Sequence, residues 1–153
     1  MAEYLVKDGM GIIPDGTIKI VDFAFWDCKE LTNVIIPDSV KEIGLVAFEG
    51  CSSLTSITIP ASVKFIRQEA FKECPALNEI IVDKGNTVYD SREGCNAIIG
   101  PNDVLLYGCN TTVIPTSVKK IAEGAFSSCP SLKSITIPQG VKKISRHAFS
   151  RCQ

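Results

Sequence analysis

Hydrophobic residues follow two successive patterns within the stretch 53–74, SLTSITIPASVKFIRQEAFKEC. Leu54, Ile57 and Ile59 first give an L-x-x-I-x-I pattern whose last two apolar positions alternate as in a β-strand. Pro60 follows at once and ends the strand, because it has no N–H to donate to a sheet. The next apolar residues have the spacing of one face of a short helix: Ile66, Ala70, Phe71, Cys74 and Leu77. The stretch therefore predicts one coil that contains a short strand, a turn and a short helical or 3-10 segment.

This pattern recurs along the chain with a period of 23 residues. The proline that ends each strand recurs at Pro14, Pro37, Pro60, Pro115 and Pro138. The Ala-Phe pair keeps the same period at Phe25, Phe48, Phe71, Phe126 and Phe149, and so do Cys28, Cys51, Cys74, Cys129 and Cys152. Several independent positions share one period, which is the signature of a solenoid of the leucine-rich repeat type, with one short parallel strand in each coil.

The repeat also resembles that of the BspA-like leucine-rich repeat family, whose coil reads roughly L-x-x-I-x-I-P-x-S-V-x-x-I-x-x-x-A-F-x-x-C-x-x. Residues 54–71 fit this pattern almost position for position, and the resemblance covers nearly all of the chain. It implies a right-handed solenoid and a bacterial surface or secreted context. It also implies adhesion to host proteins or to other cells, with no catalytic residue and no cofactor.

The chain is expected to form a single leucine-rich repeat domain over residues 1–153. Its expected parts are an irregular first coil (1–13), regular coils (14–82), an enlarged coil (83–114) and regular coils (115–153). No polar cap is visible after the last coil, where Leu132 and Phe149 are expected near an open end. A homodimer through this end would cover them.

The enlarged coil is nine residues longer than the others and contains the stretch CNAIIGPNDVLLYGC. Two short apolar segments flank the turn signal 101–103, which predicts a β-hairpin. Pairing about Asn102 places Cys95 opposite Cys109, an arrangement that allows a cross-strand disulfide in an oxidising compartment. Two buried thiols are the alternative. Tyr89 and Tyr107 are the hairpin's candidate contact residues.

The outward-facing strand positions form the candidate binding strip on the concave face of the solenoid, where leucine-rich repeat proteins usually bind. These positions are Asn33, Ile35, Ser56, Thr58, Glu79, Ile81, Ser134 and Thr136. The strip is small, polar and nearly uncharged, and Ile35 and Ile81 are its large apolar members. The alternative is that Ser and Thr are simply good strand formers on a solvated face.

Charge is distributed unevenly along a chain whose net charge is −1. The first sixty residues are acidic, whereas residues 111–153 carry seven basic residues and only one acidic residue, Glu123. In a solenoid, sequence order is spatial order, so one end should be acidic and the other basic. This asymmetry allows head-to-tail contact between copies or an anionic partner at the basic end, although a solvated face is the simpler interpretation.

The remaining chemistry argues against other functional classes. The single histidine, His147, and the absence of a C-x-x-C spacing argue against a metal site or a catalytic site. Aromatic residues do not accompany the basic residues, which argues against nucleic-acid binding. No apolar run approaches the roughly 20 residues of a membrane span. The N-terminus lacks the apolar region of a signal peptide, so a cytoplasmic location stays open beside a surface or secreted one.

We therefore expect a non-catalytic protein–protein interaction module with an adhesin-like role. Its ligand would be a host or cell-surface protein, such as an extracellular matrix or plasma protein, bound at the concave strip. The alternative is a structural segment that self-associates end to end.

Overall fold

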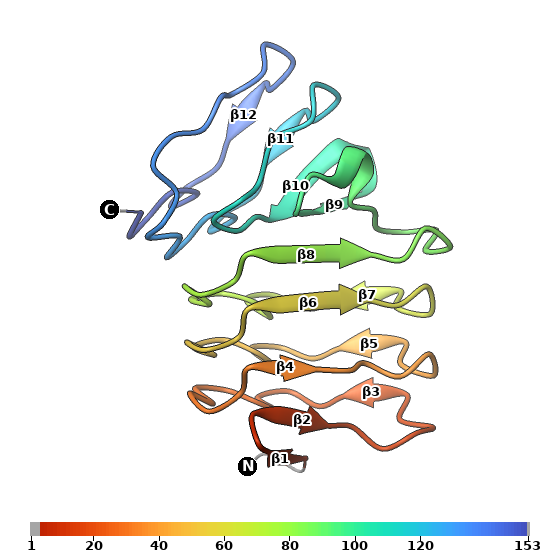
Figure 1. The fold of residues 1–153 in the computed structure, drawn as a ribbon. Coiled ribbons are helices and arrows are strands. Elements are labelled where there is room, and N and C mark those ends of the chain that lie inside the picture. Colours follow the sequence, from red (N-terminus) through yellow and green to blue (C-terminus); the bar gives the residue numbers. More distant parts are fainter. Residues whose placement is uncertain (1–3, 153) are drawn as a thin grey trace.

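The computed structural model describes residues 4–152. The chain winds into a solenoid of about six stacked coils of about 23 residues each (Figure 1). This arrangement confirms the repeat period predicted from the sequence. The C-terminal coils are tilted relative to the stack that precedes them, and the enlarged coil lies at the change of direction (Figure 1).

The L-x-x-I-x-I segments form the sheet on the near side of Figure 1. Its strands are β1 (Leu5–Lys7), β2 (Met10–Ile12), β4 (Asn33–Val34), β6 (Ser56–Ile59) and β8 (Glu79–Val82). β1 and β2 form an antiparallel pair, whereas β2 pairs with β4 and β6 pairs with β8 in parallel. The N–H of Thr55 donates to the carbonyl of Thr32 at 3.3 Å, which links the residues directly before β6 and β4 and places the two ladders side by side on one face. This is the sheet predicted to carry the binding strip.

A second parallel sheet forms where the chain returns after each proline turn. It contains β3 (Lys19–Ile20), β5 (Glu42–Ile43) and β7 (Phe65–Ile66), which pair in register at the 23-residue spacing. The buried member of each pair points into the core, as Ile20 and Ile43 do. The solvent-facing member is polar in the first two strands, so the alternation expected of a half-buried strand holds.

The enlarged coil inserts an antiparallel hairpin into the stack. It contains two 3-10 turns, Arg92–Gly94 and Pro101–Asp103, and the strands β9 (Ile98–Gly100) and β10 (Val104–Tyr107). Gly100 pairs with Val104 and Ile99 with Leu105, which confirms the hairpin centred on Asn102. β10 then pairs in parallel with β11 (Lys120–Ile121), which pairs with β12 (Lys143–Ile144).

The Ala-Phe segments form successive tight turns rather than the short helix suggested by their spacing. Two positions in each segment have a positive φ, and this interrupts a helix. In the third coil these are Glu69 (φ 57°) and Glu73 (φ 56°). The turns of neighbouring coils are joined by backbone hydrogen bonds, such as the N–H of Phe48 donating to the carbonyl of Ala70 at 2.8 Å. These inter-coil bonds replace the hydrogen bonds that a helix would make within itself.

The core is a column of aromatic rings between the sheets and the turns. The rings of Phe25, Phe48 and Phe71 stack with centroids 5.2 and 5.3 Å apart. Tyr107 of the enlarged coil takes the next place but meets Phe71 edge-on, and a separate stack of Phe126 on Phe149 follows. The buried residues accordingly form two hydrophobic clusters, one on each side of the enlarged coil.

All seven cysteines are free thiols in the structure. The disulfide considered between Cys95 and Cys109 is therefore absent, and the alternative of two buried thiols describes the structure. A register shift between Leu105 and Tyr107 ends the regular pairing before it reaches the cysteines. Cys95 packs in the C-terminal cluster and Cys109 in the N-terminal one.

Candidate functional site

The outer face of β4, β6 and β8 brings together six of the eight residues predicted for the binding strip. Ser56 pairs with Glu79 and Thr58 with Ile81, so two columns run across the sheet. Adjacent side chains within a column are about 4.8 Å apart, the spacing of neighbouring strands. The first column contains Asn33, Ser56 and Glu79, and the second contains Ile35, Thr58 and Ile81.

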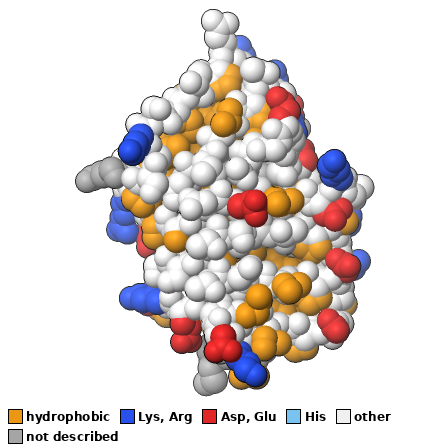
Figure 2. Space-filling view, viewed as in Figure 1, with side chains coloured by type: hydrophobic (Ala, Val, Ile, Leu, Met, Phe, Trp, Pro, Cys, Tyr) orange, Lys and Arg blue, Asp and Glu red, His pale blue; other side chains and the backbone are white. Residues whose placement is uncertain are grey.

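The second column exposes large apolar side chains to solvent. Ile35, which directly follows β4, is 70% exposed, and Ile81 of β8 is 42% exposed, although the neighbouring residues Val34 and Ile36, and Ile80 and Val82, are buried. Glu79 is the only charged residue among the predicted strip positions. Figure 2 shows this face of the molecule, where apolar side chains lie among uncharged ones and most charges lie toward the edges. An exposed apolar surface with few charges is typical of the centre of a protein interface.

The structure adds Met10 and Ile12 to this surface. Met10 pairs with Asn33 through the β2–β4 register, which places it in the first column. Ile12 lies one repeat before Ile35 and is 44% exposed, which places it in the second column. The 23-residue spacing alone places both residues in these columns, although residues 1–13 were expected to form an irregular coil.

Ser134 and Thr136 do not continue the strip. Both side chains are exposed, but residues 132–138 form no strand, and the enlarged coil lies between them and β8. The expectation of one strip from the second coil to the last coil is therefore wrong. Its physical cause is the inserted hairpin, which fills the place of a regular coil and changes the direction of the stack (Figure 1).

The two hairpin tyrosines hydrogen-bond to the backbone of the coil before them, and Tyr107 remains partly exposed. Tyr89 is buried, and its hydroxyl accepts a hydrogen bond from the N–H of Ile66 at 2.9 Å. The hydroxyl of Tyr107 accepts from the N–H of Ala70 at 3.1 Å and donates to the carbonyl of Arg67 at 3.2 Å. Burial raises the pKa of both groups, that of Tyr107 to about 12. Both tyrosines thus anchor the enlarged coil to the coil before it.

The basic end carries lysines that are paired in register in the sheet formed by β9, β10, β11 and β12. Lys120 pairs with Lys143 between β11 and β12, and the N–H of Lys142 donates to the carbonyl of Lys119 at 2.7 Å. Within residues 4–152 none of these four ammonium groups forms an ion pair. By contrast, Lys19 and Arg67 in the acidic half both pair with Glu42. The charge asymmetry seen in the sequence is therefore also a spatial one.

Neither a metal centre nor a membrane span is found in the part of the chain that the structure describes. No group of three or more His, Cys, Asp or Glu side chains among residues 4–152 is arranged to hold a metal ion. The search for a helix long and apolar enough to cross a membrane also finds none among these residues.

Comparisons with known proteins agree with this architecture. A sequence model of the BspA type leucine rich repeat region matches six copies over residues 11–95 and 102–153. The chain belongs to the BspA-type leucine-rich repeat family. The match covers the regular coils and most of the enlarged coil, and the first part of the hairpin, residues 96–101, is the internal stretch that falls outside it.

Solved structures of two leucine-rich repeat proteins and of one bacterial antigen resemble the chain. A leucine rich cell surface protein from Faecalibacterium prausnitzii is 35% identical with a TM-score of 0.71, over 86% of this chain and 36% of that one. The pneumococcal vaccine antigen PcpA is 23% identical with a TM-score of 0.75, over 88% of this chain and 36% of that one. A leucine-rich repeat protein from Eubacterium ventriosum is 23% identical with a TM-score of 0.56, over 86% of this chain and 48% of that one.

These relatives are considerably longer than the chain, which spans 36% of the length of the first two. The likeness to the second and third structures shows the fold alone. Among curated proteins, the search finds no significant match.

Proposed function

We propose that this BspA-type chain is a non-catalytic protein-binding module that recognises a protein ligand through the outer face of β2, β4, β6 and β8. The observation that supports this proposal is the apolar column of Ile12, Ile35 and Ile81, exposed on an otherwise nearly uncharged sheet. Burying such side chains against a partner removes apolar area from water at about 25 cal/mol per Å². The sheet itself is rigid, so little conformational entropy is lost on binding.

We further propose an adhesin-like role at a bacterial surface or in a secreted protein. The relative from Faecalibacterium prausnitzii, which is described as a cell surface protein, supports this location. An extracellular matrix or plasma protein is the proposed class of ligand. A flat, rigid, mostly uncharged sheet suits a folded protein surface better than it suits a small charged molecule.

The test is binding of the purified chain to fibronectin, fibrinogen and a panel of other matrix and plasma proteins at physiological salt. Ile35→Lys and Thr58→Lys place a charge in the middle of the apolar column. Each should weaken binding by about 1–3 kcal/mol, or roughly tenfold or more, because the lysine is desolvated at the interface. Thr136→Lys is the matched control, since this exposed residue lies outside the sheet.

Equal affinity for the wild type and the two strip variants would contradict the proposal, as would saturable binding lost only in Thr136→Lys. Circular dichroism on each variant would show whether the fold is retained. Substitutions at exposed positions normally change stability by less than about 0.5 kcal/mol, so a loss of binding can be separated from unfolding.

End-to-end self-association is the second candidate function, and the spatial charge asymmetry favours it. Unpaired lysines of the last coils would meet the acidic first coils of another copy. The last coil also exposes apolar side chains, Ile137 and Ile144. Association by charge should weaken with salt, because screening at 0.15 M acts over about 8 Å. Light scattering between low and physiological salt distinguishes this assembly from a monomeric binding module.

A further inference from the structure

The turns of regular coils are joined by a regular ladder of backbone hydrogen bonds. From the second coil to the third, the N–H groups of Val46, Phe48 and Gly50 donate to the carbonyls of Gln68, Ala70 and Lys72. The first and second coils are joined in the same way, and Phe126 and Ser128 continue the pattern toward the last coil. Each turn segment therefore uses one edge to donate and the opposite edge to accept.

This ladder is interrupted at the enlarged coil, which contributes a hairpin instead of a full turn segment. Only Gly108 continues the pattern, by donating its N–H to the carbonyl of Ala125 at 2.8 Å, while the hydroxyl of Tyr107 accepts from Ala70. Within residues 4–152 the N–H groups of Phe71 and Glu73 have no hydrogen-bond partner. The carbonyls of Glu123 and Ser127 lie at the positions that accept hydrogen bonds in the regular coils. They also have no hydrogen-bond partner among residues 4–152.

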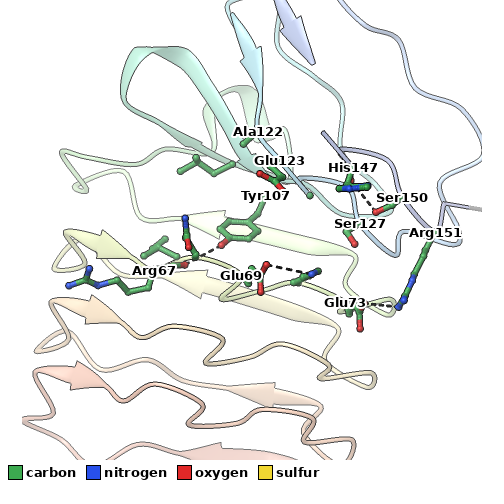
Figure 3. A pocket seen from close by; sticks show the side chains of 15 residues that line it. Arg67, Glu69, Glu73, Tyr107, Ala122, Glu123, Ser127, His147, Ser150 and Arg151 are labelled. Carbon is green, nitrogen blue, oxygen red and sulfur yellow. Dashed lines mark hydrogen bonds and ion pairs between the residues drawn. The ribbon is translucent and has the colours of Figure 1, made fainter. Parts of the chain in front are cut away.

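A cleft of about 650 Å³ lies between these two edges (Figure 3). Its volume falls within the range of roughly 300–1,000 Å³ that is typical of ligand sites. In Figure 3, Glu69 and Glu73 line one side, Glu123, Ser127, His147 and Ser150 line the other, and Tyr107 projects between them. The ion pair between Arg151 and Glu73, at 2.6 Å, closes one end.

The charges that line the cleft are balanced except for one carboxylate. Glu69 pairs with Lys72 at 3.5 Å, Glu73 pairs with Arg151, and Arg67 pairs with Glu42 outside the cleft. Glu123 forms no ion pair with any residue from 4 to 152. The imidazole of His147 is the remaining titratable side chain on the same side. A ligand with one cationic group would therefore complete the charge pairing.

We propose that this cleft binds a short extended peptide segment of a partner protein, with a lysine or arginine side chain directed at Glu123. The peptide backbone would accept from Phe71 and Glu73 and donate to Glu123 and Ser127, as the missing turn segment would. Recognition by addition to an exposed backbone edge takes its affinity from main-chain hydrogen bonds and its specificity from side-chain pockets. This site is separate from the apolar column on the near sheet and does not depend on it.

The first test uses nuclear magnetic resonance of the whole chain with the probe peptide acetyl-Ser-Ala-Lys-Ala-Ser-amide. Saturable shifts are expected at the backbone amides of Phe71, Glu73 and Ser127. The same peptide with N-methylated amides should bind about tenfold more weakly, because it cannot donate to the carbonyl edge. Shifts of equal size with the N-methylated peptide, or no shifts with either peptide at millimolar concentration, would overturn the proposal.

The second test blocks the cleft with a side chain that this repeat position already tolerates. Ser127 occupies the position of Trp26 in the first coil, where the indole is exposed. Ser127→Trp should therefore fold and abolish the peptide-induced shifts. Glu49→Trp is the matched control, since Glu49 has the same repeat position but lies outside the cleft. Peptide binding that survives Ser127→Trp, or that is lost equally in both variants, would overturn the proposal.

Two further variants separate the parts of the proposal. Glu123→Gln should weaken the lysine peptide severalfold and leave a peptide with alanine in place of lysine unchanged. Equal affinities would remove the cation from the proposal. Thr58→Lys, which tests the near sheet, should leave peptide binding unchanged, so failure of one site is distinguishable from failure of the other.

Discussion

Cysteine side chains form hydrogen bonds between neighbouring coils in addition to packing in the core. Among the repeated cysteines, Cys51 and Cys74 are buried in the core, and their thiols also donate hydrogen bonds. Sγ of Cys51 lies 3.1 Å from the carbonyl of Phe25, and Sγ of Cys74 lies 3.2 Å from that of Phe48. Burial raises the pKa of the Cys51 thiol to about 12, so it remains a neutral donor. The sequence predicted the position of the thiols but not this bond, because the bond depends on the preceding coil.

Gly108 should tolerate no larger residue, because the ring of Phe126 lies directly against it. A Cβ atom on Gly108 would be 2.6 Å from Cζ of Phe126. Gly108→Ala therefore forces a buried ring to move, and we expect it to lower the free energy of unfolding by about 2–3 kcal/mol. Urea denaturation followed by tryptophan fluorescence and circular dichroism measures this change.

Gly124→Ala is the control for this effect. Gly124 has a φ of +68° and open space around it, so alanine there meets only backbone strain of about 1–2 kcal/mol. Gly108→Ala should be the more destabilising of the two. If Gly124→Ala costs as much or more, close contact with Phe126 is not what requires glycine at position 108.

The enlarged coil shows which parts of a secondary-structure element a sequence can specify. The turn signal at 101–103 predicted the hairpin and its centre, because turn residues act on their immediate neighbours. The inward direction of Tyr89 and Tyr107 was not predictable in this way. Their hydroxyls bond to backbone groups of Ile66 and Ala70, which are 23 and 37 residues away. The turns at the Ala-Phe segments were missed for a similar reason, since inter-coil hydrogen bonds decide them.

Arg92 should stabilise the enlarged coil in a pH-dependent way. Its guanidinium donates to both carboxylate oxygens of Asp90 and to Asp103, each at 2.7 Å, and holds the pKa of Asp90 below its ordinary value of 3.8. Arg92→Ala should lower the free energy of unfolding at pH 7 by about 1 kcal/mol, because partial exposure of the carboxylates screens the interaction. Thermal unfolding monitored by circular dichroism measures this difference.

The sign of the pH dependence follows from the lowered pKa. The stability that Asp90 contributes is present above pH 3.8 and is lost as the pH falls through the folded-state pKa. The difference between wild type and Arg92→Ala should thus stay constant from pH 7 to about pH 5 and shrink below pH 4. Arg146→Ala, at an exposed residue without an ion pair among residues 4–152, should match the wild type throughout. A difference that grows in acid would contradict the assignment.

At the scale of the whole molecule, the repeat period predicts how the regular coils stack. It does not predict how the coils after the enlarged coil are oriented relative to the coils before it. In the regular coils the core positions recur at 23 residues, so the period alone predicts the register of β6 on β8 and of β3 on β5. The same period predicted that Ser134 and Thr136 would continue the strip. It failed there because the orientation of the last coils depends on how the hairpin packs, which no local signal encodes.

The division of the core into two clusters predicts that the two ends of the solenoid lose structure separately. Phe48 is stacked between Phe25 and Phe71 in the larger cluster, whereas Phe126 stacks only on Phe149. In a solenoid, stability is a sum of coil and interface terms, so a defect in one cluster acts mainly on its own side. Phe126→Leu should therefore speed amide exchange around β11 and β12, and Phe48→Leu should do so around β4 and β6.

These two substitutions are matched, because both rings are fully buried and both lose the same atoms. Each should cost about 1–2 kcal/mol by loss of packing. Hydrogen exchange with mass spectrometry shows which coils exchange their amide hydrogens faster in each variant. In the wild type, peptides from the last two coils should exchange first, because their cluster is smaller and includes the half-buried Phe149. Uniform acceleration across the chain in both variants would instead mean that the hairpin couples the two clusters into one cooperative unit. The anchoring bonds of Tyr107 to Arg67 and Ala70 would then be the structural basis of that coupling.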